Sequence, residues 1–401
     1  MRTLRSKARP TGQDHRATPF ELFFDLVYVF AITQITGYMA RQRDAEGVLQ
    51  GLMTLALLWG TWSGYTWLGN HSRADEGAPR AGMIVAMAAM FVLALAIPEA
   101  WSGGPGSLVL VVAYLLVRWV HLAIYAVAAR DDPGLRRQVA VTWTPLAVSA
   151  VLLVCGALLG GRPQTVLFAL ALVVDWVGIY VTTRHGHWRL RSPAHLTERH
   201  GLFMILAIGE SIVAVGAGAA GQPLSAALLL AAIQGIAVAV ALWWSYFDAV
   251  SRAAARRLHG EGRLRLAVEA YTYGHFPIIA GIVLAALGIE GVVAHAGDTD
   301  PLGVFSTLAL YGGAALYLLG HLLFRLRIHH VFSGAHLAAT GALLLIAPVA
   351  AMLPPLAAPV GVLAVLTVVI VVEAQRNGQG RASFLARPRP RTTDSLLVED
   401  T

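Results

Sequence analysis

The chain has 401 residues, of which 57% are hydrophobic and only 13% charged, and its formal net charge at pH 7 is +7. Soluble proteins carry about 25% charged residues, so a soluble fold of this length would leave much apolar surface in water and is excluded. A disordered chain is excluded as well, because such chains are polar and rich in charge. The composition therefore predicts a membrane protein that crosses the bilayer many times.

The N-terminal segment, residues 1–18, is basic and precedes the first apolar segment. That apolar segment contains Glu21 and Asp25, and no small-residue cleavage site follows a short apolar core. We therefore expect an uncleaved first span rather than a signal peptide. The single cysteine, Cys155, lies in an apolar run, which excludes a disulfide framework and a metal site built from cysteines.

Twelve segments are long and apolar enough to span the bilayer, for which a helix needs about 20 residues. In chain order they are 19–39, 47–69, 80–98, 106–129, 138–159, 164–183, 199–219, 224–248, 266–288, 302–325, 331–352 and 355–373. Only a few residues around Pro354 separate the last two, so eleven spans is the alternative. The predicted fold class is an all-α polytopic membrane protein with about twelve transmembrane helices.

The positions of the basic residues predict the orientation. Nearly all of the 30 Lys and Arg residues fall in alternate connections that begin with the N-terminal tail, whereas the opposite connections hold Arg41, Arg43 and Arg162. Because cytoplasmic loops carry the excess of Lys and Arg, both termini are expected in the cytoplasm of a bacterial inner membrane. The basic charge is then explained by topology, so the expected partner is the lipid bilayer and not nucleic acid.

The predicted domain organisation is a basic segment (1–18), a transmembrane domain (19–373) and a disordered cytoplasmic tail (374–401). Weak sequence similarities between corresponding spans favour two parallel six-helix halves, 19–183 and 199–373. Tyr114, Arg118 and His121, for example, correspond to Tyr317, His321 and Arg325. Chance similarity between apolar segments is the alternative explanation, and the sequence does not decide between the two. It also does not define the oligomeric state.

Ionisable side chains inside the spans are the candidate functional residues, because each costs several kcal/mol at membrane depth unless it is paired or hydrated. Four are candidates for proton coupling: Asp25, Asp175, Glu210 and His275. Six are candidates for substrate binding or ion pairing: Glu21, Arg118, His121, Glu198, Arg199 and His321. Nearly all fall in the half predicted to be cytoplasmic, which favours a polar cavity open to that side. The alternative is a purely structural network of ion pairs.

Other features carry less functional information. The tryptophans near span ends, such as Trp67 and Trp188, are interpreted as interfacial anchors. Soluble-enzyme motifs, including the phosphate-binding loop and His-Glu-x-x-His, are absent from the sequence. A zinc or iron site of His121, His275 and His321 is chemically conceivable, but nothing in the sequence brings the three together. We predict no metal and no cofactor.

Two long motifs resemble a known family. The segment from Pro19 to Gln34 is similar to the opening signature of the bacterial low temperature requirement A family, and the segment from His195 to Ile212 is similar to its second signature. Arg118-x-x-His121 and Tyr271-Thr-Tyr-Gly-His275 fit the same pattern. His200 departs from it, since an aromatic residue is more usual there. The resemblance implies an integral membrane protein and points to Glu21, Asp25, Arg118, His121, Glu198, Arg199, Glu210 and His275, but it implies no reaction.

Three functions are compatible with these features. The favoured one is a proton-coupled secondary transporter of an unidentified small solute, in which Asp25 and Glu210 exchange protons, Asp175 and His275 relay them, and Arg118 binds an anionic group. The second is a membrane-embedded enzyme that acts on a lipid or isoprenoid with the same side chains as acid and base. The third is a sensor or assembly protein with a structural polar core.

Overall fold

The computed structural model describes residues 15–71, 76–184, 188, 190–249, 258 and 263–385, and these residues contain helices and no strand. The helices of the first half are α1 (Pro19–Gln42), α2 (Ala45–His71), α3 (Gly77–Ala96) with a short extension η2 (Ile97–Glu99), α4 (Pro105–Ala128), α5 (Pro133–Leu159) and α6 (Gly161–Arg184). Those of the second are α7 (Pro193–Ala219), α8 (Ala226–Ala249), α10 (Arg263–Ala267), η3 (Val268–Tyr273), α11 (His275–Ala294), α12 (Val304–His329), α13 (Gly334–Ala350) and α14 (Ala358–Leu385).

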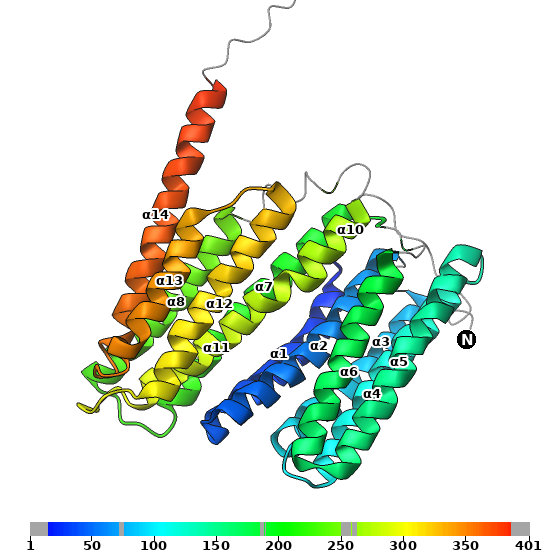
Figure 1. Ribbon diagram of the computed structural model, residues 1–401, viewed down its shortest axis with the longest axis horizontal. Helices are drawn as coiled ribbons and strands as arrows, with labels where there is room; N and C mark the ends of the chain where they lie inside the picture. Colours follow the sequence, from blue (N-terminus) through cyan, green and yellow to red (C-terminus); the bar gives the residue numbers. More distant parts are fainter. Residues whose placement is uncertain are drawn as a thin grey trace, which may run out of the picture.

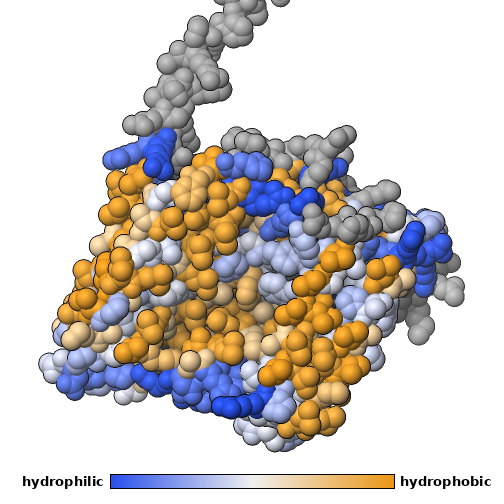
Figure 2. Space-filling model, in the orientation of Figure 1, coloured by the Kyte–Doolittle hydropathy of each residue, from blue (hydrophilic) through white to orange (hydrophobic). Residues whose placement is uncertain are grey.

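Ten of the described helical segments are long and apolar enough to cross a membrane, with α10, η3 and α11 together forming one of them. The two remaining long helices, α2 and α13, do not meet the length and apolarity that a membrane span requires. Helix α13 has 17 residues, and α2 carries polar side chains that its central position buries along almost its whole length. The outer helices present apolar side chains over most of the face in Figure 2. The protein is therefore an all-α polytopic membrane protein.

The helices coincide with the predicted spans, although several are longer than predicted. Helices α13 and α14 are separate and pack against each other, so the described residues contain twelve long helical segments, of which ten are long and apolar enough to span a membrane. Helix α14 continues to Leu385, past the expected end of the last span at residue 373. Residues 1–14 and 386–401, which include most of both predicted terminal segments, lie outside the described residues.

The packing order of the first six helices recurs in the second six. The packed pairs α1–α2, α1–α3, α3–α4, α4–α5, α5–α6 and α2–α6 have the counterparts α7–α8, α7–α11, α11–α12, α12–α13, α13–α14 and α8–α14. The two groups lie next to each other in Figure 1, the first running from blue to green and the second from green to red. The halves meet through α1 and α2 on one side and α7 and α11 on the other. This is the pattern that a duplicated six-helix unit predicts.

Glycines hold the centre of the second half together. A Cβ atom on Gly288 of α11 would lie 2.4 Å from the backbone nitrogen of Leu310 in α12, and one on Gly313 of α12 would lie 2.4 Å from that of Ala285. The two backbones therefore approach as closely as small residues allow, which is the usual basis of tight helix pairing in membranes. Helix α11 is buried along most of its length and forms a firm support for the segment η3 before it.

The segment η3 is a π-helix, with a hydrogen bond from the backbone nitrogen of Gly274 to the oxygen of Glu269 at 3.0 Å. The wider turn leaves the Ala270 carbonyl free to accept from Nδ1 of His275 at 3.0 Å. Segments of this kind are frequent at functional sites because they redirect side chains and expose backbone groups. Here η3 directs Thr272 and Tyr273 toward the first half of the protein.

Candidate functional site between the two halves

The first helices of the two halves are joined by a buried ion pair between Asp25 of α1 and Arg199 of α7. Two parallel hydrogen bonds connect them, Nη1 to Oδ2 at 2.7 Å and Nη2 to Oδ1 at 2.9 Å. The indole nitrogen of Trp62 donates to Oδ1 of Asp25 at 2.8 Å, and the Arg199 guanidinium lies over the Trp62 ring. Asp25 and Arg199 have no exposed surface. A bidentate pair of this kind fixes the relative position of the two side chains.

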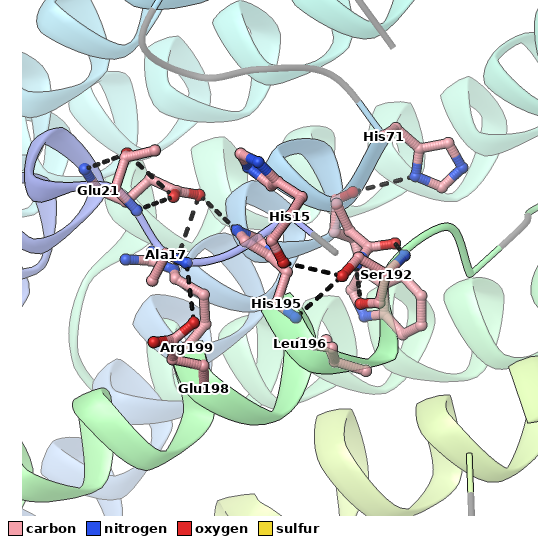
Figure 3. A network of polar contacts seen from close by, with 12 residues as sticks. His15, Ala17, Glu21, His71, Ser192, His195, Leu196, Glu198 and Arg199 are labelled. Atoms are coloured by element: carbon pink, nitrogen blue, oxygen red, sulfur yellow. Dashed lines mark hydrogen bonds and ion pairs between the residues drawn. The ribbon is translucent and has the colours of Figure 1, made fainter. Parts of the chain in front are cut away.

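A second pair lies one turn nearer the start of both helices, as Figure 3 shows. One carboxylate oxygen of Glu21 lies 2.9 Å from Nε2 of His195, and the other accepts hydrogen bonds from the backbone and hydroxyl of Thr18. Thr18 and Glu21 form a capping box that begins α1. Glu198 accepts from the backbone nitrogen of Ala17 at 3.1 Å, so it anchors the segment before α1 to α7.

These two pairs join equivalent positions of the two halves. Helix α1 begins after the N-cap Thr18 and helix α7 after the N-cap Ser192, and each has proline as its first residue. The Glu21–His195 and Asp25–Arg199 contacts both connect residues 174 positions apart, which is also the separation of the two N-caps. A two-fold axis brings a residue against its own equivalent. The α1–α7 contact therefore has the geometry of a pseudo-two-fold axis with opposite charges on its two sides.

A further ion pair lies within each half, between its fourth and sixth helices. In the first half Nη2 of Arg118 in α4 donates to Oδ1 of Asp175 in α6 at 2.7 Å, and both side chains are buried. In the second half Arg325 of α12 contacts Glu373 of α14. The prediction listed Arg118 as an ion-pair residue and Asp175 as a proton relay, and the structure brings these two together. Tyr114 lies at the same carboxylate, with its hydroxyl 3.5 Å away.

An open cavity of about 820 Å³ lies beside the Arg118–Asp175 pair. Its walls come from α2, α4 and α6 of the first half and from α10 and η3 of the second, and Arg118 and His121 belong to its lining. Aromatic side chains dominate: Trp59, Trp67, Trp176, Trp188, Tyr125 and Tyr273. In Figure 2 a paler hollow separates the apolar flanks formed by the two halves. The cavity lies toward the end of the bundle at which α1 begins and α2 ends, here called the N-terminal face.

Thr272 of the π-helix holds two of these indoles. The Trp59 indole nitrogen donates to its carbonyl at 2.6 Å, and that of Trp67 donates to its hydroxyl at 3.0 Å. Ser63 donates to the same hydroxyl at 3.1 Å. With their N–H groups occupied, both indoles offer the cavity ring surface rather than hydrogen-bond donors.

Two tyrosines bridge the cavity between α6 and η3. The Tyr273 hydroxyl donates to the Trp176 carbonyl at 2.7 Å, and the Tyr180 hydroxyl donates to the Glu269 carboxylate at 3.1 Å. Glu269 is also held by Arg265 at 2.8 Å and by Arg327. The two helices make little backbone contact with each other, so these side-chain bridges connect the halves across this side of the cavity.

Polar groups in the cavity wall remain without partners within the described part of the chain. They are Nε of Arg118, Nε2 of His121 and the hydroxyl of Tyr125. An unpaired buried donor or acceptor costs about 1–3 kcal/mol, and all three atoms lie just behind the accessible cavity surface, so a ligand reaches them only after neighbouring side chains shift. Nε2 of His121 lies against Gly64, where a Cβ atom would be 3.1 Å away.

Glu210 lies deeper, in the α1–α7 contact, and is 1% exposed. Its carboxylate accepts a hydrogen bond from the Thr33 hydroxyl of α1 at 2.7 Å. Among the described residues it has no ion pair, in contrast to Asp25 and Asp175. Glu210 is thus a buried carboxyl group at the interface of the halves that can change protonation without breaking a salt bridge.

The histidines do not gather as a metal site of His121, His275 and His321 would require. His121 lines the first-half cavity, whereas His275 accepts from the Tyr246 hydroxyl at 3.0 Å in the second half. His321 packs against the same tyrosine, and neither of its ring nitrogens has a hydrogen-bond partner within the described residues. This hypothetical metal site is wrong, because His121 lies in the first half of the protein and His275 and His321 lie in the second.

Metal-ligand spacing does occur among the described residues for His15, Glu21 and His195. Glu21 is occupied there by the capping box and by His195, and Nε of Arg199 lies 3.9 Å from its carboxylate. A guanidinium so close opposes the binding of a second cation. We therefore assign this group to the contact between the halves.

Sequence reasoning missed the aromatic character of the cavity. Trp67 and Trp188 were interpreted as interfacial anchors, yet both line the cavity. The available signal was the density of Trp and Tyr near one end of the second, fourth and sixth predicted spans. Periodicity alone does not say whether such rings face lipid or the interior.

Taken together, the fold and this site define a polytopic helical membrane protein whose two halves meet across buried ion pairs and an aromatic cavity. Residues 16–371 match the family of bacterial low temperature requirement A proteins, and the chain belongs to that family. It is 30% identical over 324 residues, 77% of each chain, to an uncharacterised protein of Rhizobium meliloti (strain 1021). No solved structure matches the chain.

Proposed function

We propose that this protein is a proton-coupled secondary transporter of a small solute, with the aromatic cavity as the solute site. In this proposal the protein lies in the bacterial inner membrane with the N-terminal face and both termini in the cytoplasm. The excess of Lys and Arg in the connections on that side supports the orientation. The cavity as described is then open toward the cytoplasmic half of the membrane.

The observation that carries the proposal is that the walls of one cavity come from both halves. Transporters built from repeats place the solute at the interface of the repeats, and rocking of one repeat against the other exposes it to each side in turn. The bridges from Tyr180 and Tyr273 connect the halves at this cavity. Their rupture would let η3 move away from α6, while the ion pairs between α1 and α7 serve as the pivot.

Glu210 is the proposed proton carrier. It lies in the same α1–α7 contact as the pivot and is bound by a neutral hydroxyl rather than a cation. Protonation changes the charge at this contact by one unit and converts the carboxylate from an acceptor into a donor. The preference between two arrangements of α1 and α7 would then depend on the proton, which is the requirement for coupling.

The test is proton flux in liposomes that contain the purified protein and a pH-sensitive dye. We expect a pool of small solutes to drive proton movement in the wild type and at least tenfold less in Glu210→Gln. Glu99→Gln, which changes an exposed carboxylate in η2, is the matched control and should behave as the wild type. Folded, correctly inserted protein that moves no protons with any pool would overturn the proposal. A lipid-directed enzyme would then be tested by lipid profiling of a deletion strain.

A further inference from the structure

We infer that the aromatic cavity binds a planar aromatic carboxylate, that is, one or two fused rings carrying a carboxylate group. The inference takes the cavity that the proposed function uses as its solute site and names the class of molecule that fits it. It depends on the shape, charge and hydrogen bonding of the lining and applies whether or not binding leads to transport.

The side chains that line the cavity favour a ligand with a flat, apolar ring system. Four tryptophans and two tyrosines line the cavity, and aromatic rings bind other aromatic rings through offset stacking or edge-to-face contacts. The N–H groups of Trp59 and Trp67 and the hydroxyl of Tyr273 are occupied by protein acceptors. These three groups therefore offer ring surface and no hydrogen-bond donor to a ligand.

The charge of the lining selects an anion. Arg118 is the one permanently charged side chain among the lining residues, and its partner Asp175 is not part of the lining. Asp175 accepts from Nη2 and leaves Nε of Arg118 without a partner within the described residues. A cage of aromatic rings would otherwise suit an organic cation, but such a cage needs no guanidinium and commonly has a carboxylate.

The size of the cavity limits the ligand. Its volume of about 820 Å³ includes open space at the mouth, so this value is an upper limit for the ligand. One or two fused rings with a short acidic side chain fit such a space. A phospholipid with two acyl chains does not.

The test is isothermal titration calorimetry on the full-length protein in detergent with four matched probes. Indole-3-acetate has the ring and the carboxylate, tryptophol has the ring without charge, tryptamine has the ring with a positive charge, and hexanoate has the carboxylate without a ring. We expect indole-3-acetate to bind at least tenfold more tightly than each of the other three. Tighter binding of tryptamine would overturn the anion assignment, and equal binding of hexanoate would overturn the aromatic one. Absence of binding by all four probes would overturn the inference.

Variants locate the site. The double variant Arg118→Gln/Asp175→Asn removes the cation together with its counter-ion, so that no buried charge is left unpaired. It should weaken indole-3-acetate at least tenfold and leave tryptophol unchanged. Trp188→Leu, in the connection before α7, should weaken both indole probes, whereas the control Trp101→Leu, outside the cavity, should weaken neither. If the double variant does not fold, the comparison of Trp188→Leu with Trp101→Leu alone tests whether the ligand binds in this cavity. Unchanged affinity in Trp188→Leu would overturn the assignment to this cavity.

The two proposals fail in distinguishable ways. Selective binding of indole-3-acetate without any uptake into liposomes would keep this inference and remove the transporter. Proton-coupled uptake of a solute without a ring, together with no binding of the indole acid, would keep the transporter and remove this inference.

Discussion

Asp25 is tied by three hydrogen bonds to Arg199 and Trp62 and is fully buried. Asp25→Asn leaves the Arg199 charge buried without its partner, and breaking one side of a buried pair costs about 3–5 kcal/mol. We expect a large drop in the thermal unfolding temperature in detergent. Arg137→Gln, at an exposed site in α5, should leave it unchanged.

The exchanged variant Asp25→Arg/Arg199→Asp gives a sharper test of the same contact. Because the two residues occupy equivalent positions in their helices, the exchange restores the ion pair and should recover part of the stability. The recovery is incomplete, since the hydrogen bond from Trp62 to Asp25 is lost. An exchanged variant as unstable as Asp25→Asn alone would contradict the equivalence of the two positions.

For single residues, the sequence predicted which charged side chains are buried better than it predicted which side chains they contact. The cost of a charge in the membrane singled out Asp25, Arg118, Asp175, Arg199 and Glu210, and all five are buried in the structure. His321 was a candidate for ion pairing and His195 was not, but His195 is the histidine that contacts Glu21. Partner choice depends on how whole helices are placed, which the spacing along one helix does not determine.

At the level of helices, α6 and η3 are joined by ring contacts of Tyr273 with Trp176 and Tyr180 and by the hydrogen bonds of two tyrosine hydroxyls. A hydrogen bond of this kind contributes about 0.5–1.5 kcal/mol, so removal of both in Tyr180→Phe/Tyr273→Phe should raise the fraction of molecules in which η3 has moved away from α6 by roughly tenfold. The measurement is the rate at which a maleimide labels Thr183→Cys in the cavity wall, in a background without Cys155. Tyr38→Phe is the control, because Tyr38 lies near the C-terminal end of α1, away from the cavity. Equal labelling rates would mean that the bridges do not hold η3 against α6.

Helix existence and extent followed from the apolar runs, because a bilayer requires a fixed length of apolar helix. The π-helical segment from Val268 to Tyr273 did not follow, although the nearby Gly274 and Pro277 mark an irregular stretch in the sequence. A wider turn depends on tertiary contacts, here the three hydrogen bonds that Thr272 accepts from α2. Such contacts leave no periodic signal.

At the scale of the whole molecule, the orientation is a proposal that accessibility can test. In a protein without Cys155, Asp300→Cys lies in the connection between α11 and α12, and Asp131→Cys lies in the connection between α4 and α5. If the N-terminal face is cytoplasmic, a membrane-impermeant maleimide should label Asp300→Cys in spheroplasts and should label Asp131→Cys only after lysis. The reverse pattern would contradict the proposed orientation.

The opposite charges at the α1–α7 contact also determine which halves can associate. Two copies of the first half, joined by the same two-fold operation, would place Asp25 against Asp25 and Glu21 against Glu21. Two copies of the second half would place Arg199 against Arg199. Buried like charges in contact cost several kcal/mol, so each half rejects a copy of itself and accepts the other. Two identical six-helix chains could therefore not associate through this contact with these residues in place.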